Sequence, residues 1–229
     1  MNNNQAVIRK KRSLISEMGR SFIPVLKTKY FYIGLISVIV GIALNFASQT
    51  YLHHYMIEGK TLPMLSDLIL DHLPVIDLSL VYDLFSLIIL IIFVAYVIDK
   101  KEYNKVPYFL LLWGIFYIIR GIFIVLTPFG NPPEFNGSNP LFNGFSHFEL
   151  GVYPSGHVGN AFLLFLLVKD RLYKWILASC LVVITISLFL AHSHYSIDIL
   201  SGLFFAYAIR SFGEKYLRMF QLEPEITKG

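Results

Sequence analysis

The sequence predicts an all-α, polytopic membrane protein with six transmembrane helices. Of its 229 residues, 55% are hydrophobic and only 15% are charged, and the mean hydropathy is +0.61. Soluble globular domains carry about 25% charged residues, so this composition excludes that class, together with disordered and fibrous chains. About six spans of roughly 20 residues fill this length, which leaves no room for a second folded domain.

Six apolar stretches account for the predicted helices, and polar or Gly- and Pro-containing segments separate them. They cover residues 30–51, 78–98, 107–127, 156–168, 175–191 and 195–212. We therefore expect a basic N-terminal segment of residues 1–29, a membrane domain of residues 30–212 and a C-terminal tail of residues 213–229. The first stretch is not a short core followed by a small-residue cleavage site, so it is expected to be an anchor and not a signal peptide.

The basic residues predict the orientation of the spans. Of the 19 lysines and arginines, all but Lys60 and Arg120 lie in or beside the two tails, in the loop 99–106 or in the loop 169–174. Lys and Arg concentrate on the cytoplasmic side of membrane proteins, so both termini are expected to be cytoplasmic. The basic residues form no recognition surface, so nucleic acid is not an expected partner. The acidic residues agree with this orientation, because five of them gather in the first outer loop and the neighbouring start of the second span: Glu58, Asp67, Asp71, Asp77 and Asp83.

Cysteine usage and residue spacing favour chemistry without a metal or a cofactor. Cys180 is the single cysteine, which excludes an internal disulfide and a cysteine zinc site within this chain. No cluster has metal-ligand spacing, so neither a metal nor a cofactor is expected. No repeat of fixed period stands out, which argues against an inverted-repeat transporter.

One motif at the outer end of the fourth span suggests an anion site. It reads Tyr153-Pro154-Ser155-Gly156-His157. Ser155 and Gly156 expose backbone N–H groups at the start of a helix, where the helix dipole favours negative charge. Phosphate is the natural ligand of such a site.

A second motif, at residues 192–198, contains His194 and Asp198 four residues apart. On a helix they lie on one face, where the carboxylate fixes the imidazole tautomer and stabilises its charge. His194 is then a candidate nucleophile, and His157 can protonate the leaving oxygen, so the pair predicts phosphoester cleavage. His192 lies on another face and stays ambiguous, while four histidines have no such support: His53, His54, His72 and His147.

Arg120 is the candidate for electrostatic stabilisation of the phosphate. It lies seven residues before Thr127, about 10 Å into the membrane, where a lone charge costs about 2.5–3.5 kcal/mol, so it needs a partner. Structural alternatives exist for each residue: His157 as a helix cap, His194 with Asp198 as an interfacial hydrogen bond, and Arg120 paired with Asp83.

Helix lengths give two different depths for the histidines. His157 is 12 residues from Lys169, about 18 Å along a helix, whereas His194 is 20 residues from Lys174, about 30 Å. Tilt, snorkelling or an extension of the fourth helix through Arg171 would reconcile them. In each case the site is expected near the outer leaflet.

The long outer loop of residues 128–155 is rich in Gly, Pro, Asn and Phe. It is longer than a simple connection between two helices requires. Its segment 128–152 is the candidate lid over the site. Asn136-Gly137-Ser138 forms a glycosylation sequon on the outer side, a three-residue pattern that is also frequent by chance.

At these motifs the sequence resembles the type 2 phosphatidic acid phosphatase superfamily, and within it the sphingomyelin synthase-like branch, over about residues 62–207. Residues 190–198, Leu-Ala-His-Ser-His-Tyr-Ser-Ile-Asp, are similar to the His-Tyr-Thr-x-Asp motif of the synthases, with Ser196 in place of threonine. Ser155-Gly156-His157 matches the shared Ser-Gly-His. Two weaker matches are Arg120 with Thr127 and Pro132, where Phe123 replaces a threonine, and Pro63 with Asp67.

The resemblance implies that His194 takes the phosphoryl headgroup covalently, that Asp198 orients it, and that His157 acts first as acid and then as base. Departures bear on the acceptor. Gly151 stands where the synthases have an acidic residue, with Glu149 nearby as a possible headgroup contact, and Pro154 gives the Pro-Ser-Gly-His of the lipid phosphatases. Conversely, Leu188 stands where the phosphatases have an arginine, and their Lys-x6-Arg-Pro motif is absent from the sequence.

The leading hypothesis is a lipid phosphotransferase that moves a phospho-headgroup from a glycerophospholipid donor to a lipid alcohol such as ceramide. The alternative is a lipid phosphate phosphatase, in which water is the acceptor. A third class, a membrane scaffold or transporter, requires both histidines to be structural. The expected partners are the two lipids and the membrane, and the active site is expected to face the non-cytoplasmic leaflet.

Overall fold

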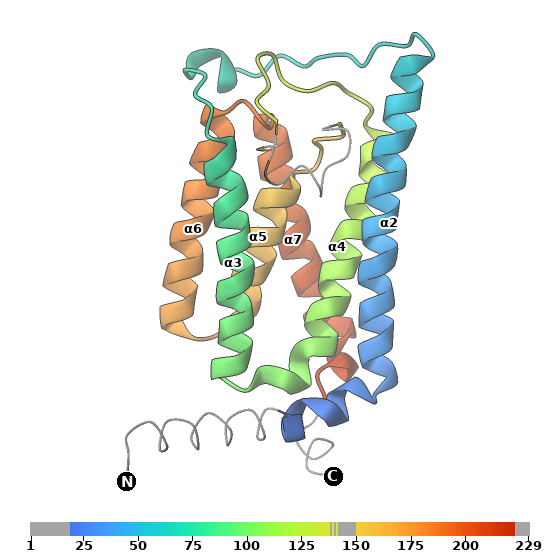
Figure 1. The fold of residues 1–229 in the computed structure, drawn as a ribbon, viewed down its shortest axis with the longest axis vertical. Coiled ribbons are helices and arrows are strands. Elements are labelled where there is room, and N and C mark those ends of the chain that lie inside the picture. The colour runs from blue at the N-terminus through green and yellow to red at the C-terminus, as the bar shows by residue number, and fades with distance from the viewer. Residues whose placement is uncertain (1–18, 138, 140, 142–149, 223–229) are drawn as a thin grey trace.

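The computed structural model describes residues 19–137, 139, 141 and 150–222, and within these ranges all regular secondary structure is helical. Six of the described helices form an elongated bundle (Figure 1). They are α2 (Lys29–Ile57), α3 (Ser79–Asp99), α4 (Val106–Leu126), α5 (Gly156–Leu167), α6 (Arg171–Leu190) and α7 (Ser196–Tyr216), and short 3-10 turns lie at Leu70–His72, Glu102–Lys105 and Arg218–Phe220.

Four of these helices are long and apolar enough to cross a membrane: α2, α3, α6, and α4 together with the turn that precedes it. The predicted all-α membrane fold is therefore confirmed at this level. α5 has only 12 residues, and α7 is long enough but less apolar. Outward-facing apolar side chains, among them Ile36, Ile91, Val182 and Phe204, give the bundle a surface suited to lipid.

The helix ends differ from the predicted spans for local reasons. α6 begins at Arg171, four residues before the predicted Trp175, because the Asp170 carboxylate accepts hydrogen bonds from the N–H groups of Leu172 and Tyr173. α7 continues four residues past the predicted end. Beyond it, the Leu222 N–H donates to the Asn104 carbonyl, and the Asn104 side-chain amide donates to the Leu222 carbonyl. Residues 19–26, in the predicted N-terminal segment, are also helical.

Small residues let α2 pack closely along α4. A Cβ on Gly114 would lie 2.5 Å from the Ser37 carbonyl carbon, and one on Gly41 would lie 2.7 Å from Tyr117 Cβ. Close approach of this kind is the usual basis of helix association in membranes. The polar side chains on the same face bond across it: Asn45 Nδ2 donates to the Tyr117 carbonyl at 2.5 Å, and Ser48 Oγ to the Gly121 carbonyl at 2.7 Å. This contact sets the position of Asn45 beside Arg120.

α5 lies inside the bundle, and its upper end stands below the upper ends of α4 and α6 (Figure 1). The Ser155 N–H donates to the Asp198 carbonyl at 3.0 Å, so α5 starts level with the first turn of α7. Gly159 and Gly202 allow this approach, since a Cβ on Gly202 would lie 2.8 Å from the Ser155 carbonyl oxygen. The two predicted depths differ because the short α5 spans only part of the bundle. The suggested extension of this helix through Arg171 is not found, since α5 ends at Leu167 and Arg171 begins α6.

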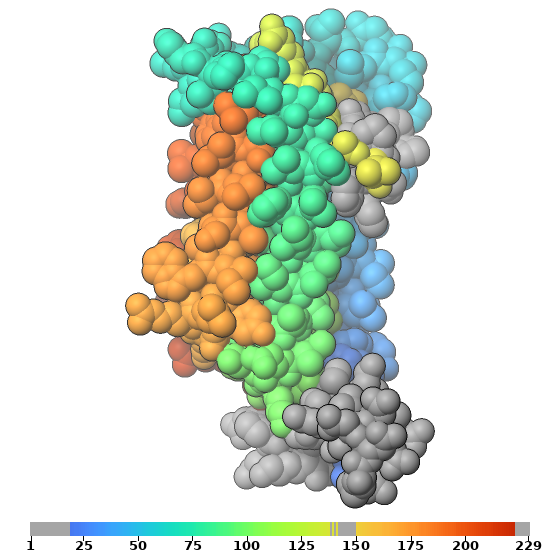
Figure 2. Space-filling view, turned by 60° about the vertical axis from the view of Figure 1, so that its left-hand side comes forward, coloured from blue at the N-terminus to red at the C-terminus, as the bar shows by residue number. Residues whose placement is uncertain are grey.

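The segment between α2 and α3 crosses the same end of the bundle, above α3 and α6 (Figures 1 and 2). Asp67 anchors it: one carboxylate oxygen accepts the Ser196 N–H at 2.5 Å and the other accepts the Ser196 hydroxyl at 2.8 Å. Burial alone would raise the pKa of Asp67, but donors from Ser196, Leu70 and Ile69 bring it below its ordinary value. The anchored carboxylate caps the start of α7.

Candidate functional site

His194 and Asp198 form a buried pair at the start of α7. The chain leaves α6 after Leu190, turns through His192, whose φ is 50°, and enters α7 at Ser196. His194 Nδ1 lies 3.3 Å from Asp198 Oδ2, and the two side chains are 6% and 0% exposed. The spacing of four residues therefore brings imidazole and carboxylate together as predicted.

Asp198 determines which nitrogen of His194 is free. Its Oδ2 also accepts the Tyr195 N–H at 2.9 Å, which fixes the carboxylate on the side facing Nδ1. An ionised carboxylate only accepts hydrogen bonds, so Nδ1 carries the proton and Nε2 keeps its lone pair. Burial lowers the pKa of His194, in the loop before α7, and Asp198 opposes this only in part. The neutral ring with a free Nε2 is the form that a nucleophile requires.

His157 forms a second histidine–carboxylate pair, with Asp83 from α3. Its Nε2 lies 3.2 Å from Asp83 Oδ1, and the Asp83 side chain is 6% exposed while that of His157 is 29% exposed. The Tyr82 ring packs edge-on against the imidazole with centroids 5.1 Å apart. Asp83 Oδ2 accepts the Asn139 N–H at 2.8 Å. Asp83 is thus engaged by the histidine, and the suggested pairing of Asp83 with Arg120 is not found.

The two pairs face each other across the start of α5. The rings of His157 and His194 have centroids 5.9 Å apart and an interplanar angle of 69°. His157 contacts its carboxylate through Nε2, and His194 contacts its own through Nδ1. The second nitrogen of each ring, Nδ1 of His157 and Nε2 of His194, is therefore left for chemistry. One histidine can therefore attack an atom to which the other is close enough to deliver a proton.

Arg120 reaches the same place from α4. Its Nε donates to the Pro154 carbonyl at 3.1 Å, one terminal nitrogen to Asn45 Oδ1 at 2.5 Å, and the other to the Gly151 carbonyl at 3.1 Å. A guanidinium has five N–H donors, so one on each terminal nitrogen remains. We expected Arg120 to need a partner within the membrane. Its three partners are neutral oxygens, so its positive charge remains available to an anion.

Ser155 and Gly156 bring the start of α5 to this guanidinium. Ser155 is the N-cap, and its hydroxyl accepts the Val158 N–H at 3.3 Å. A Cβ on Gly156 would lie 3.0 Å from Arg120 Nε, so a larger residue would crowd the arginine. The first N–H groups of a helix have no intrahelical partner. The N–H groups of Gly156 and His157 therefore add to the positive potential of Arg120.

Two residues of the site were not foreseen in the roles they have here. Asp83 was noted for its acidity and as a rival partner of Arg120, and Asn45 was not noted. A signal for both existed, since each is a polar residue within an apolar stretch. Glu149, the possible headgroup contact, lies outside the described residues, as do Ser138 of the sequon and residues 140 and 142–148 of the candidate lid. Asn136 itself is described, and its Nδ2 donates to the Ala191 carbonyl at 3.2 Å.

Within the part of the chain that the structure describes, no three His, Cys, Asp or Glu side chains come together as a metal site. In comparisons with known proteins, no family model and no curated protein matches the chain.

Proposed function

We propose that the protein is a lipid phosphotransferase that transfers a phospho-headgroup from a glycerophospholipid to a lipid alcohol through a covalent intermediate on His194. The observation that supports it best is the pair of carboxylate-bound histidines with ring centroids 5.9 Å apart. Arg120 and the start of α5 add positive charge beside them. A purely structural histidine pair gives no reason for two separate buried carboxylates to orient the two rings.

In the first half-reaction, His194 Nε2 attacks the phosphorus of the donor and forms a P–N bond. The bond from phosphorus to the glycerol oxygen breaks, and His157 gives this oxygen its proton, so that diacylglycerol leaves as a neutral alcohol. Asp198 stabilises the charge that develops on His194. Asp83 holds the His157 ring in place through Nε2, and the ring gives the proton from its other nitrogen.

The phosphoryl oxygens bind where the positive groups converge. The two remaining Arg120 N–H donors and the N–H groups of Gly156 and His157 stabilise the negative charge that grows in the transition state. In the second half-reaction, neutral His157 removes the proton of the acceptor hydroxyl, whose oxygen displaces His194 from phosphorus. His157 and His194 return to their starting states, so atoms and protons balance over the cycle.

We also propose that all six helices, α2 to α7, lie within the bilayer, with both termini cytoplasmic. The distribution of basic residues supports this orientation, which brings the histidines to the non-cytoplasmic leaflet. α5 and α7 need not satisfy the criteria for a lone span, because α5 is surrounded by α3, α4, α6 and α7. The sphingomyelin synthase-like resemblance of the motifs is consistent with this arrangement.

A lipid phosphatase is the second candidate, favoured by one feature. Pro154 precedes Ser155-Gly156-His157, as in the lipid phosphatases, and its carbonyl accepts a hydrogen bond from Arg120. Water then takes the place of the lipid alcohol in the second half-reaction.

Product partition distinguishes the two candidates. The purified protein in nanodiscs receives headgroup-labelled phosphatidylcholine, phosphatidylethanolamine or phosphatidic acid, each with and without ceramide or diacylglycerol. We expect a new phospho-headgroup lipid to form faster than free headgroup phosphate, and only with an acceptor present. His194→Ala should abolish it, and His72→Ala, an exposed histidine outside the site, should not. Phosphate release from phosphatidic acid with no acceptor-dependent product from any donor would establish the phosphatase instead.

A further inference from the structure

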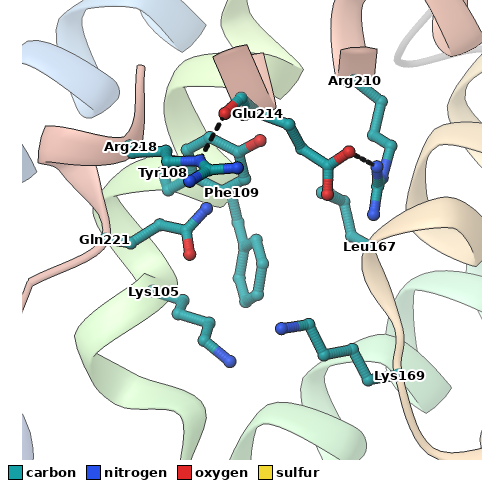
Figure 3. A pocket seen from close by; sticks show the side chains of 9 residues that line it. All are labelled: Lys105, Tyr108, Phe109, Leu167, Lys169, Arg210, Glu214, Arg218 and Gln221. Atoms are coloured by element: carbon teal, nitrogen blue, oxygen red, sulfur yellow. Dashed lines mark hydrogen bonds and ion pairs between the residues drawn. The ribbon is translucent and has the colours of Figure 1, made fainter. Parts of the chain in front are cut away.

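A cavity of about 260 Å³ lies at the end of the bundle opposite the two histidines. It is enclosed by the start of α4, the link from α5 to α6, the end of α7 and the turn that follows α7 (Figure 3). Four basic side chains line it, Lys105, Lys169, Arg210 and Arg218, against a single carboxylate. The lining therefore has a net charge of 4 − 1 = +3.

The one carboxylate and its neighbours neutralise only part of this charge. Glu214 forms an ion pair with Arg210, and Lys105 forms one with Glu102 outside the lining. Arg218 Nε donates to the Glu214 backbone carbonyl at 2.6 Å, a neutral acceptor. Lys169 forms no ion pair with any residue that the structure describes. Figure 3 shows the amines of Lys105 and Lys169 extending toward the same space. Among the described residues, Lys169 and Arg218 thus have no carboxylate partner at this shared cavity.

A buried hydroxyl in the same cavity is a second, independent observation. The Tyr108 side chain is 3% exposed, and its hydroxyl lies beside the Gln221 side chain without a well-formed hydrogen bond to it. Buried polar atoms without a partner are uncommon in native structures. A hydroxyl can donate to an anion, and an amide can donate through its NH2 group. The cavity therefore combines unneutralised cations with donors that await an acceptor.

We propose that this cavity binds a phosphate-bearing ligand. Its volume is slightly below the range of about 300–1,000 Å³ typical of small-molecule sites, which fits a phosphorylated headgroup or a small phosphate ester and not a whole lipid. Arg218 provides a planar fork for phosphate oxygens and Lys169 a mobile ammonium. Phosphate monoesters carry more charge than diesters, so a net lining charge of +3 favours them. The proposal is independent of the chemistry assigned to the histidines.

The ligand has two possible sources with this chemistry, a lipid headgroup and a soluble phosphate. Native mass spectrometry of the full-length protein measures lipid binding from mixed micelles that contain phosphatidylcholine alone or with added phosphatidylinositol phosphate or phosphatidylserine. Calorimetric titration with inorganic phosphate and glycerol phosphate measures the soluble arm. Three variants are compared with the wild type: the double variant Lys169→Ala/Arg218→Ala, the single variant Tyr108→Phe, and the control Lys174→Ala. Lys174 lies in the same α5–α6 region but outside the lining.

We expect binding in one of the two arms, with phosphatidylinositol phosphate preferred to phosphatidylserine if the source is a lipid. The double variant should weaken it at least tenfold, since a charge-assisted hydrogen bond is worth roughly a tenfold change in affinity. Tyr108→Phe should weaken it less, and Lys174→Ala should leave it unchanged. Absence of binding in both arms would overturn the proposal, and so would an equal loss in Lys174→Ala, which would indicate charge attraction at the surface. Thermal unfolding of each variant without ligand identifies any loss caused by misfolding, and Arg218→Lys provides a milder replacement in that case.

Discussion

Asp83 Oδ1 lies 3.2 Å from His157 Nε2 and joins α3 to α5 through the ring opposite the candidate nucleophile. The carboxylate is nearly inaccessible to solvent, and its contact with Nε2 fixes the orientation of the ring. Asp83 is therefore a positioning residue for the proposed acid, comparable to Asp198 for the proposed nucleophile. The proposed site contains two such pairs where the sequence motifs indicated one.

Asp83→Asn should lower kcat by about 10² or more, the usual contribution of general acid catalysis. The amide keeps the shape of the side chain but replaces one charged acceptor oxygen with an NH2 donor, so the His157 ring is no longer oriented by a carboxylate. The measurement is kcat, KM and thermal unfolding for the wild type and the variant. An unchanged kcat with a lower unfolding temperature would show that Asp83 only supports the fold.

His194→Ala should abolish turnover, and Asp198→Asn should lower it by roughly 10⁴, the loss seen when a carboxylate that orients a catalytic histidine is replaced. The amide can present its NH2 group to Nδ1 in place of an acceptor oxygen, which favours the tautomer with the proton on Nε2 and so blocks the nucleophile. Rapid quenching with labelled donor should trap a phosphoryl adduct on His194, and His157→Ala should be comparably inactive. An adduct on His157 with none on His194 would reverse the two roles.

The acidic limb of kcat/KM should lie below pH 6.5, because burial lowers the pKa of His194 below that of a free imidazole. At pH 6.5, where half of a free imidazole is protonated, most of His194 is then still neutral. The sign for stability follows from the same shift: below pH 6.5 the unfolded chain binds a proton that folded His194 does not, so the free energy of unfolding decreases. Profiles of kcat/KM and of thermal unfolding from pH 5 to 8 test both, with His194→Gln as the reference that lacks this titration.

Arg120→Lys should lose most of the activity although the charge is retained, because a point donor cannot bond Asn45, Pro154 and Gly151 and still reach a phosphate. Folding should survive, since the α2–α4 contact is also made by other residues, among them Gly41, Ser48 and Gly114. Asn45→Ala should reduce activity less than Arg120→Lys, and the double variant should show coupling of the two losses. Full additivity of the losses would mean that Asn45 does not position the arginine.

The sequence predicts features within one chain segment better than contacts between distant segments. Hydropathy located six helices to within about six residues, and the spacing of His194 and Asp198 gave their contact, because both depend on neighbours along one chain segment. The pairing of Asp83 with His157 joins residues 74 apart. Which helices meet is determined by packing, through residues such as Gly202 against Ser155, and no single-segment period encodes it.

The depth of α5 shows the same limit. The 12 residues from His157 to Lys169 and the 20 residues from Lys174 to His194 predicted different heights for the two histidines. The contact between the Ser155 N–H and the Asp198 carbonyl shows that α5 stops short of the bundle's end. Cap residues Ser155 and Asp170 were readable as helix starts in principle, because both have oxygen side chains before apolar runs. The capping role of Asp67 on α7 was not, since it joins residues 129 apart.

Cysteine labelling at the two ends of the bundle tests the proposed orientation of the site. In a Cys180→Ala background, Met64→Cys lies at the histidine end and Leu172→Cys at the end that holds the phosphate cavity, and both positions are 67% exposed. If the basic residues determine orientation, a membrane-impermeant maleimide should label Met64→Cys in intact cells, and Leu172→Cys only after permeabilisation. The two substitutions are matched in exposure, so a difference in labelling reports the side of the membrane and not reactivity. The opposite pattern would bring the histidines to the cytoplasmic leaflet, and would require a donor and an acceptor lipid from that side. Labelling of both in intact cells would show that the helices do not separate the two ends, which would contradict the six-span arrangement.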